Sequence, residues 1–345
     1  MRDPFEIGSA IVAAGEQQIV QIPLSRLADH TDMMLKALVV HGKKPGPTMF
    51  VSGAIHGDEI IGVEIIRRIA RMKQLSKIKG TLILIPIVNS YGFLGMSRYL
   101  PDRRDLNRVF PGSEKGSPAS QLAYTFMQEI VSRCDFGLDL HSGAIHRENL
   151  PQIRANLSDP IVKEIATAFG ASIMLNANLR DGSLREAAQS VGCHMLLYEA
   201  GEALRFNETA VRIGVKGVLG VMRNIGMLPK IKPSKRKIEP VEPVSSHWVR
   251  APISGLMRAA HGLGDAVKKG AVIASVAGPL GETEENVLAK YSGVIIGRTN
   301  LPIVNRGDAL FHIARVDDLE DTETVIENRV QNAEDDPLFD GIEIV

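Results

Sequence analysis

The sequence has few cysteines and does not begin like an exported protein. Only two of its 345 residues are cysteines, Cys134 and Cys193, and both lie in otherwise apolar segments. Two such cysteines argue against a disulfide framework and favour a reducing compartment. Residues 1–6 contain acids and a proline where a secretory signal needs a cationic end and an apolar run. We therefore expect a cytoplasmic protein.

An excess of one charge and long apolar runs are also missing. Lysine plus arginine and aspartate plus glutamate number 40 each, so no net charge draws the chain to nucleic acid or to an anionic membrane surface. No segment reaches about 18 uninterrupted apolar residues, the length that a membrane-spanning helix needs. The expected partner is a small molecule, with no nucleic acid and no membrane involved.

Apolar runs of strand length alternate with amphipathic segments of helix length from Thr48 to about Gly226. With 44% apolar residues the chain can bury a large core, and its length suggests two domains. The alternation predicts a layered α/β domain. The predicted strands cover residues 48–55, 81–88, 136–140 and 194–198. The first predicted helix begins after Gly57, and further helices are predicted over residues 119–131, 160–169, 183–190 and 208–224.

A change of composition after residue 228 divides the chain. Residues 1–228 form the predicted large domain, and the segment 229–246, rich in proline and lysine, is the predicted linker. Short strands between glycines over residues 247–315 predict a small β-domain. Residues 316–345 carry eleven acids against the single base Arg329 and lack a sustained apolar period, so we expect a mobile or edge-docked tail.

Two predicted strand ends carry residues that bind metals. His56 and Glu59 follow the first strand, and His141 follows the third in Asp139-Leu-His141-Ser-Gly. A catalytic zinc typically takes three such ligands and leaves one position to water or substrate. Because parallel strands end at one sheet edge, the three residues meet if their strands are neighbours. Asp58 is expected at the helix start or as a supporting carboxylate.

A basic loop and a strand carboxylate complete the candidate site. Residues 98–108 hold four arginines together with Asn107. Such a loop suits anion capture, although a solvated charge run is the alternative and is favoured for Arg103. Glu199 ends an apolar strand, where a carboxylate is costly unless it is functional or paired. A structural ion pair, for instance to a loop arginine, fits this position equally well.

Together these motifs resemble those of a known family. His56-x-x-Glu59, Asp105-Leu-Asn107-Arg108, Asp139-Leu-His141-Ser-Gly and Tyr198-Glu199-Ala-Gly are similar to the signature set of the succinylglutamate desuccinylase and aspartoacylase family, relatives of the zinc carboxypeptidases. The resemblance covers about residues 37–226, and the small β-domain fits the family's two-domain plan. It implies a zinc-carboxypeptidase-like αβα sandwich with a mixed central sheet, plus a smaller C-terminal all-β domain of the barrel-sandwich type.

The resemblance also implies a reaction. His56, Glu59 and His141 would bind one Zn²⁺ per chain, and Glu199 would be the general base. The implied activity is removal of an acetyl or succinyl group from an N-acyl amino acid, or from a similar small amide, by metal-activated water.

Substrate-binding roles follow from the same resemblance. Asn107 and Arg108 would hold the substrate carboxylate, and Arg98 would polarise the scissile carbonyl. Arg103 and Arg104 lie close enough in sequence to compete with Arg98 for that role.

Residues 146–154, directly after the third ligand, are the candidate lining of the specificity pocket. Arg147 or Arg154 could bind a second substrate carboxylate. Either could instead form a surface pair with Glu148 or Asp159, and this is our expectation for Arg154. The identity of the acyl group stays open at this point.

Three other functions share parts of the pattern. A zinc carboxypeptidase acting on peptides would need an open groove. A non-catalytic carrier-like binding protein is suggested by residues 249–313, which resemble a biotinyl or lipoyl carrier domain but lack its Met-Lys pair. A structural zinc protein needs a fourth ligand, for which only His146 and His194 lie near the motifs. The glycine-punctuated segment also offers candidate contacts for a homo-oligomer.

Overall fold

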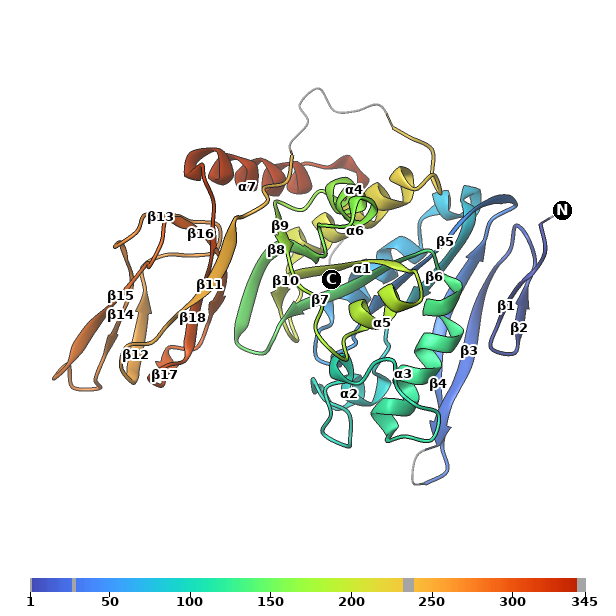
Figure 1. Cartoon of the computed structure of the whole chain (residues 1–345), viewed down its shortest axis with the longest axis horizontal. Coiled ribbons are helices and arrows are strands. Elements are labelled where there is room, and N and C mark those ends of the chain that lie inside the picture. Colours follow the sequence, from blue (N-terminus) through green and yellow to red (C-terminus); the bar gives the residue numbers. More distant parts are fainter. Residues whose placement is uncertain (1, 27–28, 232–238, 340–345) are drawn as a thin grey trace.

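A single large sheet extends through the molecule. The computed structural model describes residues 2–26, 29–231 and 239–339. Within these ranges, twelve strands form a mixed sheet (Figure 1). They are β3 (Gln17–Arg26), β4 (Asp32–His41), β5 (Lys44–Gly53), β6 (Lys79–Ile85), β7 (Phe136–Gly143), β8 (Arg147–Ala155), β9 (Ile173–Asn176), β10 (His194–Glu202), β11 (Ser245–Arg250), β13 (Ala266–Val267), β16 (Gly293–Thr299) and β18 (Ala309–Arg315). Their order is β11-β18-β16-β8-β10-β7-β5-β6-β4-β3, with β13 beside β16 and β9 beside β8.

The strands that carry the candidate site are central and parallel. β7 lies between β5 and β10 and runs parallel to both, and β6 runs parallel to β5 on its other side. These strands are rich in Val, Ile and Leu because both faces of the sheet are covered there. β8 runs antiparallel to β10, so the sheet is mixed, as the family resemblance implied.

Helices cover both faces of the central strands and complete an αβα sandwich. One face carries α1 (Ile61–Ala70), α4 (Pro160–Phe169) and α6 (Glu208–Asn224), and the other carries α3 (Pro118–Glu129) and α5 (Leu184–Ser190). Successive residues of a strand point to opposite faces. Met49 and Val51 of β5 therefore join the first core, while Phe50 joins the second.

The remaining elements of the large domain are short. They are the hairpin β1 (Phe5–Ile7) and β2 (Ala10–Val12), the helix α2 (Ser90–Leu94), and the 3₁₀ turns η1 (Lys73–Lys77), η2 (Leu106–Arg108) and η3 (Val131–Arg133). α2 starts at Asn89, whose side chain accepts a hydrogen bond from the Gly92 amide. No helix in the described ranges is both long and apolar enough to cross a bilayer.

The predicted elements form, and two strands continue beyond their predicted ends. The helices over residues 160–169 and 208–224 have the predicted bounds, and Ser183 is the N-cap of α5. β7 and β10 continue to Gly143 and Glu202, so His141 and Glu199 lie within strands. β8 was not predicted because its sequence contains several polar residues. Its pairing with β10 and β16 identifies it as a strand.

A smaller all-β domain forms the other end of the molecule (Figure 1). The strands β12 (Gly255–Ala259), β14 (Val272–Ala277), β15 (Glu284–Leu288) and β17 (Ile303–Val304) form an antiparallel sheet in the order β15-β14-β12-β17. A separate core, which includes Ile273, Ile295 and Phe311, joins this sheet to β16 and β18. Because β16 pairs with β8, the main sheet is continuous between the two domains. Of the predicted linker 229–246, residues 232–238 lie outside the described residues.

The acidic C-terminal segment contains a helix that the sequence reading did not predict. α7 (Leu319–Glu334) begins after the N-cap Asp318 and is followed by the 3₁₀ turn η4 (Pro337–Phe339). The helix buries Ile326 and Ala333 and packs beside α6 and β16. Because only a narrow face is buried, polar and acidic residues occupy most other positions and no sustained apolar period appears. Residues 340–345 of the predicted tail lie outside the described residues.

Candidate active site

Three adjacent parallel strands bring the candidate residues to one edge of the sheet. Leu140 of β7 is the partner of Gly53, the last residue of β5, and His141 is the partner of Glu199 in β10. His56 follows the end of β5 after Ala54 and Ile55. The condition attached to the sequence prediction, that the strands be neighbours, is therefore met.

A tight turn places His56 and Glu59. The backbone turns at Ala54, whose φ is +49°, and the Glu59 amide donates to the His56 carbonyl at 3.1 Å. A Cβ atom at Gly57 would lie 2.0 Å from the Gly92 backbone, so this position needs glycine for close approach. α1 begins only at Ile61, and Glu59 therefore belongs to the turn before the helix.

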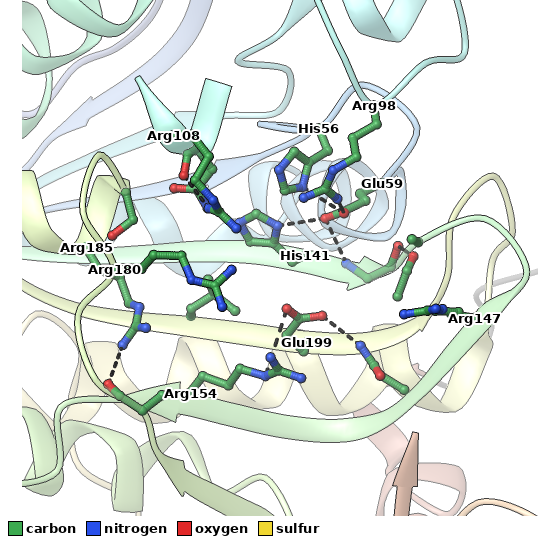
Figure 2. A pocket seen from close by; sticks show the side chains of 18 of the residues that line it. His56, Glu59, Arg98, Arg108, His141, Arg147, Arg154, Arg180, Arg185 and Glu199 are labelled. Atoms are coloured by element: carbon green, nitrogen blue, oxygen red, sulfur yellow. Dashed lines mark hydrogen bonds and ion pairs between the residues drawn. The ribbon is translucent and has the colours of Figure 1, made fainter. Parts of the chain in front are cut away.

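The side chains of His56, Glu59 and His141 converge. One ligand atom from each lies within 4.8 Å of the other two, and all three residues are buried. The Glu59 carboxylate lies between the rings, with Oε1 2.7 Å from His56 Nδ1 and Oε2 2.7 Å from His141 Nδ1 (Figure 2). Two imidazoles and a carboxylate, all with one side open to the pocket, are a donor set that fits a catalytic zinc.

In each histidine, the ring nitrogen Nε2 contacts a second carboxylate. His56 Nε2 lies 3.0 Å from Asp105 Oδ1, and His141 Nε2 lies 2.6 Å from Asp139 Oδ2. Such partners fix the ring orientation and leave Nδ1 of each ring facing the Glu59 carboxylate. Asp58 was expected either at the helix start or in this supporting role, and within the described residues no hydrogen bond joins its side chain to either ring. It lies in the turn before α1, which begins at Ile61. Asp139 could have been recognised, because residues i and i+2 of a strand share a face and Asp139 and His141 are so spaced.

The charges of the cluster stabilise one another. Burial alone would lower the pKa of both histidines, but the carboxylates raise it, through Glu59 and Asp105 at His56 and through Asp139 and Glu59 at His141. The two imidazoles conversely hold the pKa of Glu59 well below its usual value despite its burial. The cluster thus keeps an ionised carboxylate in a buried position.

A pocket of about 510 Å³ opens beside this cluster. Arg98 lines it and donates to Glu59 Oε1 at 2.9 Å and to Asp105 Oδ2 at 3.0 Å. Arg103 and Arg104, the two competitors for its predicted role, are exposed and do not line the pocket. A cavity of this size suits a small molecule.

Asn107 and Arg108 also line the pocket. Asp105 caps the turn η2 by accepting from the Asn107 amide at 2.9 Å, and Asn107 Oδ1 accepts from the Leu184 amide of α5 at 2.9 Å. The Arg108 side chain donates to the Asn107 carbonyl. These bonds hold both residues in the wall of the pocket that His56, Glu59 and His141 also line.

Glu199 lies across the pocket from the loop arginines. Its Oε2 accepts from Asn149 Nδ2 at 2.8 Å, and its Oε1 lies 4.0 Å from Arg154 Nε. The expected surface pairing of Arg154 is therefore wrong, because β8 directs this side chain into the pocket. The ion pair considered for Glu199 exists, but its partner is Arg154 and not a loop arginine.

Arg147 meets a residue of the β-domain at the rim of the pocket. Its guanidinium carbon lies 5.2 Å from the centre of the Trp248 ring, within the range of a cation–π contact. Trp248 in turn stacks on His312, with ring centres 4.8 Å apart. Both Arg147 and Trp248 line the pocket, so the second domain contributes part of its wall.

Two further arginines complete the pocket and were missed from the sequence. Arg180 and Arg185 line it from the segment around the start of α5 (Figure 2). Burial and the neighbouring charge of Arg154 lower the pKa of Arg185, and burial together with Arg180 lowers that of Arg108. Nothing in their local sequence separates these residues from ordinary surface arginines, because only the tertiary fold groups them.

Comparison with known proteins gives consistent results. Residues 45–225 match the model of the succinylglutamate desuccinylase/aspartoacylase catalytic domain. Over 309 residues the chain is 26% identical to the N-alpha-acetyl-L-2,4-diaminobutyric acid deacetylase of Halomonas elongata, which covers 86% of this chain and 90% of that protein.

Solved structures share the whole architecture. A succinylglutamate desuccinylase/aspartoacylase from Rhodobacter sphaeroides superimposes with a TM-score of 0.78 at 23% identity, over 91% of this chain and 97% of that one. The product-bound ectoine utilization protein of Ruegeria pomeroyi gives 0.78 at 23% identity, over 91% and 96%. At this identity the likeness establishes the fold.

Proposed function

Because this chain belongs to the succinylglutamate desuccinylase/aspartoacylase family, we propose that it is a zinc-dependent deacylase that hydrolyses the amide bond of N-acyl amino acids. In this reaction water adds to the acyl carbon, the C–N bond breaks, and the amine leaves with a proton. The products are a free carboxylic acid and an amino acid.

The observation that carries the proposal is the convergence of His56, Glu59 and His141 beside Glu199. Their ligand atoms lie within 4.8 Å of one another, and both histidines are oriented by carboxylates. A zinc ion bound there would supply Lewis acidity and lower the pKa of a bound water from about 15.7 towards 7.

The protein's own residues would manage protons and charge. Glu199 would accept a proton from the attacking water at a carboxylate oxygen and pass it to the leaving amine. Arg98, fixed beside Glu59, would donate to the carbonyl oxygen as negative charge develops on it. Arg108 would bind the substrate carboxylate and so determine which end of the amide faces Glu199.

The charges of the pocket favour a substrate with more than one carboxylate. Its lining includes two carboxylates, Glu59 and Glu199, against six arginines, which are Arg98, Arg108, Arg147, Arg154, Arg180 and Arg185. Both carboxylates already have cationic or hydrogen-bonding partners. Among the described residues that line the pocket, no carboxylate is left for a substrate ammonium group such as that of diaminobutyrate. We therefore propose N-succinyl amino acids or N-acyl derivatives of acidic amino acids as substrates.

Metal content and amine release test the proposal together. The purified protein would be assayed for zinc and for turnover of N-acetyl and N-succinyl amino acids, N-acetyl-diaminobutyrate and a peptide. We expect about one zinc per chain and faster turnover of the dianionic substrates. Glu199→Gln should retain the zinc and lose about 10²-fold or more in kcat. His141→Ala should lose the zinc.

Glu148→Gln is the matched control for Glu199→Gln. Glu148 lies in β8 and does not line the pocket, so its replacement should leave kcat unchanged. Turnover of the peptide alone would favour the carboxypeptidase alternative. A protein that binds no zinc after the metal is supplied would overturn the proposal.

A further inference from the structure

The β-domain is connected to the active site through the pairing of β8 with β16. Gly297 is the partner of Asn149, and Arg298 is the partner of Glu148. The side chain of Gln152 adds a hydrogen bond of 3.0 Å to the Ile296 carbonyl. β8 is therefore held by β10 of the large domain on one side and by β16 of the β-domain on the other.

Asn149 extends from this junction to Glu199. It is buried, with 8% of its surface exposed, and its Nδ2 donates to Glu199 Oε2 at 2.8 Å. The other side chain at the Glu199 carboxylate, Arg154, is 4.0 Å away. Asn149 thus makes the shortest side-chain contact that orients this carboxylate within the described chain.

Gly297 leaves the space that the Asn149 amide occupies. A Cβ atom at position 297 would lie 2.9 Å from Asn149 Oδ1 and 3.3 Å from His312 Cβ. The φ angle of Gly297 lies outside the left-handed region, so its backbone conformation does not require glycine. The close approach of Asn149 is what distinguishes this position, since a side chain here would force that amide to shift.

We infer that β16 of the β-domain positions the general base: Gly297 admits Asn149, and Asn149 orients Glu199 for proton transfer. This inference rests on the proposed role of Glu199. Gly297 and Asn149 are positioning residues, since they act through Glu199. The β-domain would then contribute to the chemistry of the site in addition to its wall at Trp248.

A double-mutant cycle on the zinc-loaded protein tests the inference. Gly297→Ala and Asn149→Ala should each lower kcat about tenfold to a hundredfold, the effect expected of a misplaced catalytic group, with KM nearly unchanged. Because both changes act on one contact, the double variant should be no slower than Asn149→Ala alone. Losses that multiply in the double variant would show that Gly297 acts independently and would overturn the inference.

Gly262→Ala is the matched control within the β-domain. A Cβ atom at position 262 would meet nothing within 4 Å, so this variant should keep the kcat and the melting temperature of the natural protein. If Gly297→Ala lowers only the melting temperature and leaves kcat intact, position 297 is merely structural and the inference is wrong.

Crystal structures separate this inference from the proposed function. In Gly297→Ala and Asn149→Ala the Glu199 carboxylate should move from its natural position, whereas in Gly262→Ala it should not. An unmoved carboxylate would overturn the inference even if the protein is an active deacylase. A moved carboxylate in a protein without deacylase turnover would uphold the positioning and reject only the proposed reaction.

Discussion

Arg108 and Arg103 belong to one basic loop, but only Arg108 lines the pocket. A guanidinium can hold both oxygens of a carboxylate, whereas a lysine ammonium acts as a point charge. Arg108→Lys should therefore raise KM about tenfold, which corresponds to about 1.4 kcal/mol of binding free energy. Arg103→Lys should leave KM within about twofold, since exposed charges contribute little. Steady-state kinetics on an N-succinyl amino acid decides the matter, and equal effects of the two variants would contradict the assignment.

His312 provides a pH-dependent contribution to stability. It is buried beneath Trp248, and burial together with the charges of Arg154 and His247 lowers its pKa from 6.5 to about 3. Between these values the unfolded chain binds a proton that the folded chain does not, so the free energy of unfolding falls as the pH drops from 6.5 towards 3.

His312→Phe preserves an aromatic ring beneath Trp248 and removes this titration. Urea unfolding of this variant should show a shallower loss of stability between pH 6.5 and 4 than the natural protein shows. His261→Gln, which changes a partly exposed histidine of the same domain, should leave the slope unchanged. Parallel curves for the natural protein and His312→Phe would refute the assignment.

Helices α1 and α6 are joined by a buried ion cluster. Arg68 donates to Glu64 Oε1 at 2.7 Å and to both oxygens of Glu208 at 2.7 Å. Although burial opposes ionisation, hydrogen bonds from arginines hold the pKa of both glutamates below its usual value. Arg67 also contacts Glu64, but its side chain is half exposed.

Arg68→Met should lower the free energy of unfolding by about 2 kcal/mol at pH 7, because it leaves a buried carboxylate with one partner fewer. The matched change Arg67→Met should cost less than about 1 kcal/mol. Because the folded pKa values are lowered, this stabilisation is fully present above the unfolded value of about 4.3 and is lost progressively as the pH falls below it and through the lowered folded pKa values. Denaturant melts at pH 7 and pH 3.5 should therefore show the gap between the natural protein and Arg68→Met closing.

The whole molecule should unfold as one unit, since its two domains share a sheet. Trp248 is the single tryptophan of the chain and lies in the β-domain, whereas the helices α1 to α6 belong to the large domain. The pairing of β16 with β8 and the core formed by Leu150, Ile296 and Ile326 connect the two parts. Tryptophan fluorescence and far-ultraviolet circular dichroism should then give coincident urea transitions. A fluorescence transition at lower urea would show that the β-domain opens independently.

Local sequence was sufficient to predict the parallel core and the three candidate metal ligands. Buried parallel strands appear as continuous apolar runs, and polar residues just beyond such runs must gather at one edge of the sheet. His56, Glu59 and His141 could be found for that reason, and the arginine loop and Glu199 followed from motifs of local sequence. The bounds of α4 and α6 could also be predicted from local sequence, because the spacing of apolar residues along a helix indicates which face is buried.

Which distant residues share the pocket depends on the pairing of strands and could not be predicted from local sequence. Arg154 was expected at the surface and lies beside Glu199 because β8 pairs with β10, and Trp248 reaches the same pocket because β16 pairs with β8. The helix α7 forms where the acidic sequence showed no period, because its few buried residues pack on the junction of the two domains. The local pattern of apolar and polar residues indicates which face of an element is buried. The pairing of strands far apart in the chain depends instead on the total packing energy of the folded core, to which many distant segments contribute.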